Sequence, residues 1–424
     1  MSLHVPPSLQ HRRFRLLWIG LMISVAGSQM QLWSLFWHIR VLTDQPIALG
    51  GIGVARIIPL VIFSLIGGAI ADVADRRKVM FLTQSSMAVI AVVLGLLTLN
   101  GSIQLWQIYA LTAIQAVALA FDMPARQALV PNLLPNKDLP NAFSMTSIAF
   151  QTGSIIGPAI SGLVIASLGL QWVYFINAIS YVAVLWALIA MGKVPQEIQV
   201  RDSARRQRPV SLEAIAEGVR FIIGHPIILS TMLMDFVATF FSSANTLMPI
   251  IARDVLNVGP VAYGWLSAAQ SIGAMIAAVV ISQLNEIRRQ GPIFLVSVGI
   301  FGIATVLFGM ANTLRMAMLA LIVVGAADSV STIIRNTIRQ LQTPDYIRGR
   351  MVSINQIFFA GGPQLGEIEA GIAAQLFGAP FAVISGGIAC VVAVGLIARK
   401  WPVLRTFNGD EPILAGQPAG SAAD

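Results

Sequence analysis

The sequence is poor in charge: Asp, Glu, Lys and Arg together make up 11% of its 424 residues, whereas 56% are hydrophobic. A soluble globular chain carries about 25% charged residues, so this chain cannot present a solvated surface on all sides. The deficit excludes a cytosolic enzyme and a disordered protein. Because the apolar residues come in blocks of about 20, the sequence predicts a polytopic membrane protein.

Metal-binding and nucleotide-binding residues are also scarce. Cys390 is the only cysteine and there are four histidines, which excludes a disulfide framework and any cysteine-based metal site. The chain has no His-x-x-x-His motif, no paired acidic metal motif and no P-loop. We therefore expect a protein that is not an enzyme, holds no metal or cofactor, and draws its energy from a gradient rather than from ATP.

Twelve apolar segments are long enough to cross about 30 Å of hydrocarbon as helices. The predicted spans lie near residues 14–40, 47–71, 79–99, 103–131, 141–168, 170–191, 227–252, 261–285, 292–311, 315–341, 351–377 and 380–400. The predicted fold class is an all-α polytopic membrane protein with two pseudo-symmetric bundles of six helices.

The positive charges predict the orientation, because Lys and Arg stay on the cytoplasmic side. With the N-terminus inside, only four of the 27 lie elsewhere, namely Arg40, Arg56, Arg253 and Arg315. Both termini are therefore expected in the cytoplasm. The net charge of +8 then reflects membrane topology and not nucleic-acid binding.

The chain divides into four predicted parts: an N-terminal bundle (1–192), a cytoplasmic linker (193–226), a C-terminal bundle (227–400) and a cytoplasmic tail (401–424). The tail is rich in Gly, Ala and Pro, and we expect it to be disordered. In the linker, Ser211 resembles a helix N-cap and is followed by apolar residues three or four apart. This pattern predicts an amphipathic helix at the interface, and a plain solvated linker is the alternative.

The two bundles repeat each other at an offset of 209 residues. The matching positions are Arg126/Arg335, Pro135/Pro344, Gly153/Gly362, Gly157/Gly366 and Gly162/Gly371. An internal duplication of this kind places the functional site between the halves, near the middle of the membrane.

The loop after the second span reads Gly68-Ala-Ile-Ala-Asp72-Val-Ala-Asp75-Arg76-Arg77. It resembles the Gly-x-x-x-Asp-x-x-x-Arg-Arg signature of major facilitator transporters. Asp72 can face the positive end of a neighbouring helix and Arg76 can hold a carboxylate, so the cluster can latch one conformation. The alternative is a basic loop that serves topology alone.

The fifth span carries Gly153, Gly157, Pro158 and Gly162. Glycines four apart allow close helix packing, and proline bends a helix. The pattern resembles the Gly-Pro motif of the antiporters in this superfamily, which implies export rather than import. Generic packing of small residues is the alternative.

The run from Asp122 to Arg126 and the later Gln342-Thr343-Pro344 resemble the branch that contains enterobactin exporters and macrolide efflux pumps. The resemblance covers nearly the whole chain. It implies secondary active export of amphipathic small molecules, siderophores or drugs, by proton antiport and alternating access in a bacterial inner membrane. The superfamily's Arg-x-x-Gln-Gly pattern is absent after Arg126, so a proton-coupling role does not carry over to that arginine.

Charges within the spans need a reason, because each costs at least about 2.5–3.5 kcal/mol at the bilayer centre. The candidates for proton coupling are Glu367, Glu369, Asp328, Asp235 and Asp122, and those for charge pairing are Arg56, Arg126 and Arg335. Asp122 and Arg126 are one helical turn apart and can pair on one face. Arg56 lies at a depth similar to that of the two glutamates, and we expect it to pair with one of them when the outer side is closed. Protonation would loosen this pair, and a static salt bridge is the alternative.

A candidate substrate surface lies on the first span, where Gln29, Trp33 and Phe36 or Trp37 form one stripe. Asn245 on the seventh span is a further candidate. We expect a monomer whose partners are a small-molecule substrate, protons and the lipid bilayer. A lysophospholipid flippase or uniporter of the same superfamily is the alternative function, and a transport-dead membrane sensor is a third.

Overall fold

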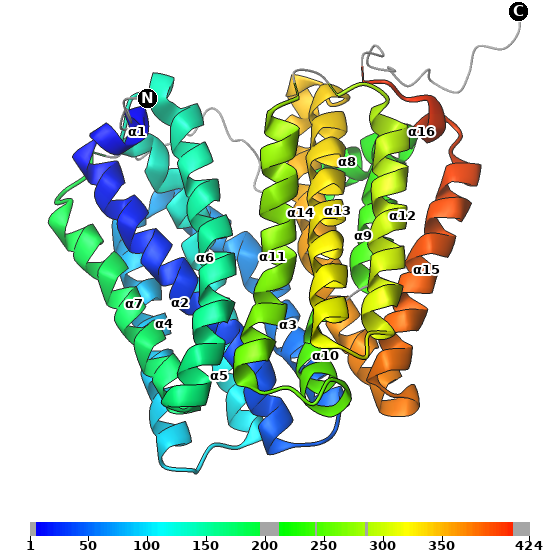
Figure 1. Cartoon of the computed structure of the whole chain (residues 1–424). Coiled ribbons are helices and arrows are strands. Elements are labelled where there is room, and N and C mark those ends of the chain that lie inside the picture. Colours follow the sequence, from blue (N-terminus) through cyan, green and yellow to red (C-terminus); the bar gives the residue numbers. More distant parts are fainter. Residues whose placement is uncertain (1–5, 196–211, 242–243, 285–286, 410–424) are drawn as a thin grey trace, which may run out of the picture.

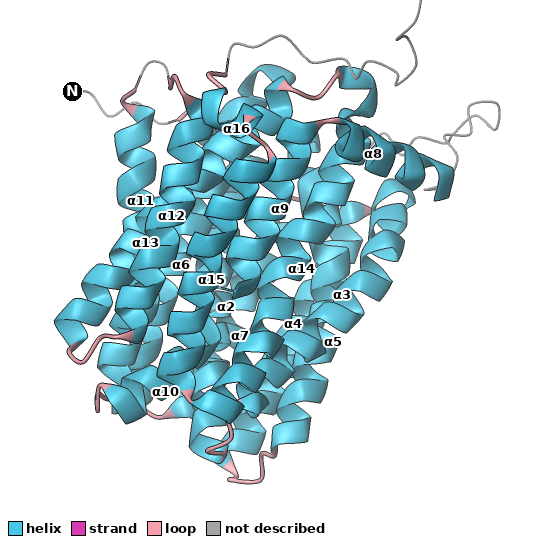
Figure 2. Cartoon of the chain, turned by 90° about the vertical axis from the view of Figure 1, so that its right-hand side faces the viewer, coloured by secondary structure: helices cyan, strands magenta, loops and turns pink. Residues whose placement is uncertain are grey.

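The computed structural model describes residues 6–195, 212–241, 244–284 and 287–409, and the regular structure within these ranges is helical throughout (Figure 2). Eleven of the segments are long and apolar enough to cross a membrane. They comprise α2 (Arg12–Leu42), α3 (Ile47–Val73), α4 (Arg76–Leu99), α5 (Leu105–Leu129), α6 (Leu139–Ser167), α7 (Leu170–Ala190), the segment Pro226–Val255 that begins with α9 (Pro226–Phe241), α11 (Pro260–Ser282), α12 (Gln290–Gly309), α13 (Leu314–Leu341) and α15 (Ala379–Lys400). The 33-residue α14 (Asp345–Phe377) packs against α3, α9 and α15 and takes the place of the twelfth.

The helices form two bundles, as predicted (Figure 1). In the first, α2 packs on α6 and α7, and α3 packs on α5; in the second, α13 packs on α11 and α12, and α15 on α12. The main contacts between the halves join α6 to α11 and α3 to α14. The short helices α1 (Pro7–Gln10) and α16 (Val403–Thr406) lie at the same end of the molecule, here called the terminal end, and the opposite end is the distal end.

The two tightest predicted connections, between the fifth and sixth spans and between the last two, are made by glycines. Gly169 has φ +99° and Gly378 has φ +90°, a backbone conformation that other residues adopt only with strain. These glycines are 209 residues apart, so the repeat found in the sequence extends to the turns.

The seventh span, predicted for 227–252, extends over Pro226–Val255 and ends in an irregular turn. It consists of α9, α10 (Ala244–Ile250) and a π-helical turn (Ile251–Val255), with Pro249 inside α10. Proline has no amide hydrogen to donate to the helical ladder, and π-turns occur preferentially at functional sites. The irregular part of this span lies at the distal end, where the two halves meet (Figure 1).

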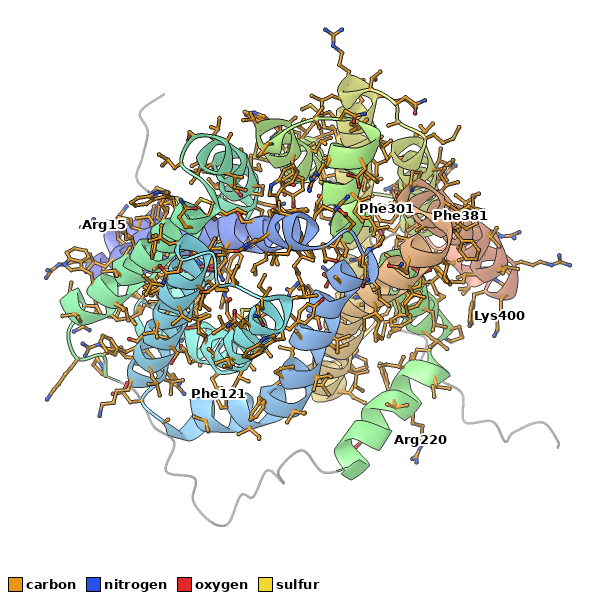
Figure 3. The ribbon with its side chains drawn as sticks, turned by 90° about the horizontal axis from the view of Figure 1, so that it is seen from below. Arg15, Phe121, Arg220, Phe301, Phe381 and Lys400 are labelled. Atoms are coloured by element: carbon orange, nitrogen blue, oxygen red, sulfur yellow. The ribbon has the colours of Figure 1, made fainter. Side chains whose placement is uncertain are left out.

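The linker contains the amphipathic helix α8 (Leu212–Gly224), which begins just after the predicted N-cap; Ser211 itself lies outside the described residues. Ile222 is buried against the second half, whereas Ile223 is exposed. Figure 3 shows α8, with Arg220, at the periphery of the bundle. This position suits an interfacial helix, although the interfacial role and the boundaries of the four parts stay predictions.

The expectation of a disordered tail from residue 401 is wrong for its first nine residues. Leu404 and Phe407 are fully or almost fully buried, and the amide of Gly291 donates to the carbonyl of Phe407 at 3.0 Å. The segment stays in place because these apolar side chains pack beside α12 and α9. The composition of the whole tail concealed this short apolar stretch, and residues 410–424 lie outside the described part.

Candidate functional site

The two halves are joined at the distal end by polar contacts. Arg40, near the end of α2, donates to both carboxylate oxygens of Asp254 over 2.9–3.1 Å. Arg253 donates to the carbonyl of Arg40 at 3.2 Å, and the hydroxyl of Tyr263 donates to the carbonyl of Trp33 at 2.8 Å. Each contact links the first half to the second, so the distal end is closed in this conformation.

Two glycine pairs bring the backbones of the halves together at this end. A Cβ atom placed at Gly162 of α6 would lie 2.4 Å from the carbonyl oxygen of Pro260 and 3.1 Å from the Cα of Gly264 on α11. A Cβ atom at Gly371 of α14 would lie 3.1 Å from the Cα of Gly50 on α3. Gly162 and Gly371 are repeat mates, so the two contacts are equivalent under the pseudo-symmetry.

The other glycines of the fifth-span motif serve a different contact. A Cβ atom at Gly153 would meet Val25, and one at Gly157 would lie 2.5 Å from the carbonyl oxygen of Ala26. Both neighbours belong to α2. Gly153 and Gly157 therefore pack α6 against α2 within the first half. Near Pro158 and Gly162 the motif packs against the second half, because the carbonyl of Pro158 faces Gly264.

Arg56 and Glu367 form an ion pair between the halves, with 3.5 Å between Nη1 and Oε1. The Glu367 side chain is 12% exposed, and its second carboxylate oxygen is buried without a hydrogen-bond partner. Glu369, two residues further on, has no ion-pair partner among the described residues. Of the two glutamates singled out in the sequence, the structure thus brings Glu367 to Arg56.

In the first half, Asp122 is fully buried and accepts three donors. Thr83 and Gln84 of α4 each donate at 2.9 Å, and Arg126 pairs with the carboxylate from the next turn of α5. The Arg126 guanidinium lies 5.9 Å from the ring centroid of Phe150 on α6. This arrangement ties α4, α5 and α6 together and suits a fixed clamp.

In the second half, a larger charge cluster joins α9 to α13. Asp235, 2% exposed, lies 3.0 Å from Arg335 and 3.5 Å from Arg339. Asp328 lies 3.9 Å from Arg335, and its side chain is 41% exposed. The cluster therefore has a buried carboxylate on one side of Arg335 and an accessible one on the other.

Arg339 and Asn355 are members of this cluster that the sequence analysis missed. Arg339 also donates to the side-chain oxygen of Asn355 on α14. The positive-inside rule already accounted for Arg339, so nothing marked it as an intramembrane charge. Its spacing of four residues from Arg335 was the available signal, because that spacing places both side chains on one helix face.

The stripe predicted on α2 begins at half-buried positions and ends among the contacts that close the distal end. Gln29 and Trp33 are half-buried, whereas Phe36 and Trp37 are 3% and 7% exposed. The rings of Trp37 and Tyr263 are 5.0 Å apart between centroids. Asn245 is half-buried on α10. Any role of these residues in substrate binding stays a prediction.

The loop motif after α3 makes contacts within the first half. Arg76 donates to the side-chain oxygen of Asn132 at 2.9 Å, Arg77 donates to the carbonyl of Leu188, and Asp75 caps the N-terminus of α4. The side chain of Asp72 lies outside the described residues, so its predicted latching role is untested.

Removing the Arg40 side chain should make opening of the distal end easier. A cysteine introduced by Ala252→Cys serves as the reporter, and Arg40→Gln is expected to raise the rate at which a maleimide modifies it by about two- to fivefold. The reason is that a partly exposed ion pair contributes up to about 1 kcal/mol. Ala252 is fully buried beside Arg253, so its reactivity reports opening. The matched control is Arg315→Gln, since Arg315 is an exposed arginine at the start of α13. Equal rates in the two variants would contradict a clamping role for Arg40.

The contact between Arg40 and Asp44 should be insensitive to pH in the neutral range. The Arg40 guanidinium hydrogen-bonds to Asp44 and holds the pKa of that carboxyl below its ordinary value of 3.8. A lowered pKa means that the contact is complete above the ordinary pKa and weakens only as the pH falls through the lowered value. Asp44 is therefore not a candidate for a physiological proton switch.

Comparisons with known proteins agree with this architecture. The family model described as transmembrane secretion effector matches residues 5–411. The enterobactin exporter EntS of Citrobacter koseri is 26% identical over 356 residues, covering 84% of this chain and 83% of the relative. EntS of Escherichia coli O81 is 27% identical over 350 residues, covering 82% of each.

Solved structures share the fold. A bacterial homologue of the human lysosomal transporter Spinster, inward-facing and unoccupied, matches with a TM-score of 0.71 and 13% identity over 95% of this chain and 99% of its own. The nucleoside transporter NupG matches with a TM-score of 0.68 and 14% identity over 91% and 98%. At these identities the matches show the fold alone.

Proposed function

The chain belongs to the transmembrane secretion effector family of major facilitator exporters, and we propose that it exports an amphipathic small molecule by proton antiport. The enterobactin exporters among its relatives favour a siderophore as substrate, with hydrophobic drugs as the second class. The proposed site of action is a bacterial inner membrane, with both termini in the cytoplasm and the distal end facing outward.

The pair formed by Arg56 and Glu367 carries the proposal of proton coupling. It joins α3 to α14 across the two halves, and one oxygen of Glu367 is buried without a partner. Protonation would remove the negative charge from this contact and weaken it. Proton binding and the closure of the distal end are then linked, because a ligand shifts a conformational equilibrium by its difference in affinity for the two states.

The way the halves touch supports the proposal of alternating access. The polar contacts and glycine pairs between them lie at the distal end, and Figure 1 shows the two bundles diverging toward the terminal end. Rocking of one bundle against the other would open the distal end and expose a site between the halves. Asp328 is the accessible carboxylate of the cluster around Arg335 and is the second candidate for carrying the proton.

The test is proton movement in proteoliposomes under an imposed pH gradient. Catecholate siderophores, hydroxamate siderophores, macrolides and lysophospholipids are added one at a time. We expect substrate-dependent proton flux that falls at least tenfold in Glu367→Gln. Glu369→Gln is the matched control, because it removes the same group two residues away, where no ion pair is formed among the described residues, and it should retain most of the flux.

Other outcomes would redirect the function. Substrate movement without proton flux would contradict antiport and favour a uniporter or a lysophospholipid flippase. Binding without any movement of substrate or protons would favour a membrane sensor. Equal loss of flux in Glu367→Gln and Glu369→Gln would remove the special role of the pair with Arg56.

A further inference from the structure

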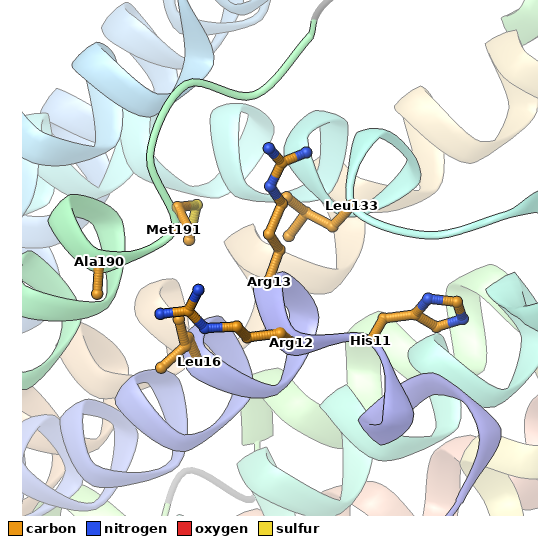
Figure 4. A pocket seen from close by; sticks show the side chains of 7 residues that line it. All are labelled: His11, Arg12, Arg13, Leu16, Leu133, Ala190 and Met191. Atoms are coloured by element: carbon orange, nitrogen blue, oxygen red, sulfur yellow. The ribbon is translucent and has the colours of Figure 1, made fainter.

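A pocket of 320 Å³ opens at the terminal end of the first half, away from the contacts between the halves. Arg12 and Arg13 at the start of α2 supply its charge, while Leu16, Leu133 and Met191 supply apolar lining (Figure 4). Ligand pockets begin at about 300 Å³, so the volume suits a small anion or the head group of a larger molecule.

The described residues that line the pocket carry an excess of positive charge. Figure 4 shows the Arg12 and Arg13 side chains leaving the start of α2 in different directions, Arg13 toward Leu133 and Arg12 toward Leu16, with the imidazole of His11 pointing away from both. No acidic residue lines the pocket among the described residues, and the carboxylate of Asp138 lies 2.8 Å from the His11 ring and is engaged there. Arg13 donates to the carbonyl of Lys193 at 3.1 Å, and neither arginine has a carboxylate partner among the described residues.

The start of α2 adds to the attraction for an anion. This helix is 31 residues long, its N-cap His11 makes no side-chain capping bond, and no acidic residue occupies its first turn. The first amides of a helix have no partner within the helix and carry partial positive charge, which favours phosphate and carboxylate groups.

An apolar stripe continues from the pocket along the spanning part of α2. Arg12, Leu16, Ile19 and Ile23 follow one another at intervals of four, three and four residues and so share a helix face. Ile19 and Ile23 are 43% and 44% exposed, and in a membrane this face meets hydrocarbon. A molecule with a phosphate at Arg12 and an alkyl chain along Ile19 would match both features.

We propose that Arg12 and Arg13 bind the phosphate group of an anionic phospholipid from the leaflet at the terminal end. Two guanidinium groups and a helix N-terminus recognise free phosphate by the same chemistry as the phosphate of a lipid. The apolar stripe below Arg12 is what favours the lipid. This site is separate from the proposed transport path, and its test does not depend on transport.

Lipid binding to the purified full-length protein can be counted by native mass spectrometry. We expect phosphatidylglycerol to bind more tightly than phosphatidylcholine with the same chains. Arg12→Gln should weaken the tightest phosphatidylglycerol site about fivefold, which is the effect of one cationic residue near an anionic surface. The double variant Arg12→Gln/Arg13→Gln should weaken it further.

The matched control is Arg15→Gln, which removes the same charge from the same turn of α2. Arg15 is exposed, donates to the carbonyl of Leu9 and does not line the pocket. An equal loss of binding in Arg12→Gln and Arg15→Gln would overturn the proposal, because general surface charge would then explain it. Displacement of phosphatidylglycerol by millimolar inorganic phosphate would also overturn it in favour of a free-phosphate site.

Discussion

Replacing Arg335 with glutamine is expected to destabilise the second half by about 3–5 kcal/mol. Arg335 is 3% exposed and lies between Asp235, at 3.0 Å, and Asp328, at 3.9 Å. Without Arg335, the cluster holds two carboxylates and only one arginine, Arg339, and an uncompensated negative charge is far more costly than the net contribution of the intact cluster. In a thermal unfolding experiment in detergent, the transition should fall by at least about 5 °C.

A double variant of the same cluster separates the effect of charge from that of packing. Asp235→Asn combined with Arg335→Gln should recover part of the lost stability, because the double variant again holds equal numbers of positive and negative charges in the cluster. Arg315→Gln, an exposed position at the start of the same helix, should leave the transition nearly unchanged. If the double variant is as unstable as the sum of the two single variants, packing and not charge is the reason for the loss.

Much of this architecture could be predicted from the sequence, because crossing a membrane places simple requirements on the length and charge of each segment. Each span needs about 20 apolar residues, and positive charges mark one side, so length and charge alone place the twelve segments within a few residues of the observed helices. The depth of a residue along its span follows from the same count. That is why Arg56 could be expected opposite Glu367 or Glu369, and why the spacing of Asp122 and Arg126 predicted their pairing.

The partners that depend on how helices are rotated about their axes could not be predicted in this way. The sequence indicated that Gly162 and Gly371 are equivalent, but not that they face Gly264 and Gly50 across the halves. Thr83 and Gln84 are ordinary polar residues in the sequence and become meaningful only because α4 turns them toward Asp122. The π-helical turn at Ile251–Val255 was hidden for a related reason: hydropathy is the same whether an apolar segment is α-helical or π-helical. No pattern indicated that Arg335 and Arg339 would share one carboxylate on α9.

Adding a single methyl group at Gly162 is expected to abolish most transport while leaving the protein folded. A Cβ atom there would lie 2.4 Å from the backbone oxygen of Pro260, so α6 and α11 must separate where the halves meet. Overpacking of this kind costs about 1–3 kcal/mol, which shifts the balance toward the distally open state by roughly 5- to 150-fold. Gly162→Ala should therefore lose substrate flux in proteoliposomes, and the Ala252→Cys reporter should react correspondingly faster with a maleimide.

The glycines of the chain provide the controls for this prediction. A Cβ atom at Gly299 of α12 meets nothing within 4 Å, so Gly299→Ala should transport normally and leave the reporter protected. The native Cys390 is fully buried and should not contribute to labelling. Gly371→Ala should open the same end through α3 and α14, with a smaller effect because the nearest backbone atom is 3.1 Å away. A Gly162→Ala variant that loses transport with an unreactive reporter would contradict this mechanism, since the fault would then lie elsewhere than in closure of the distal end.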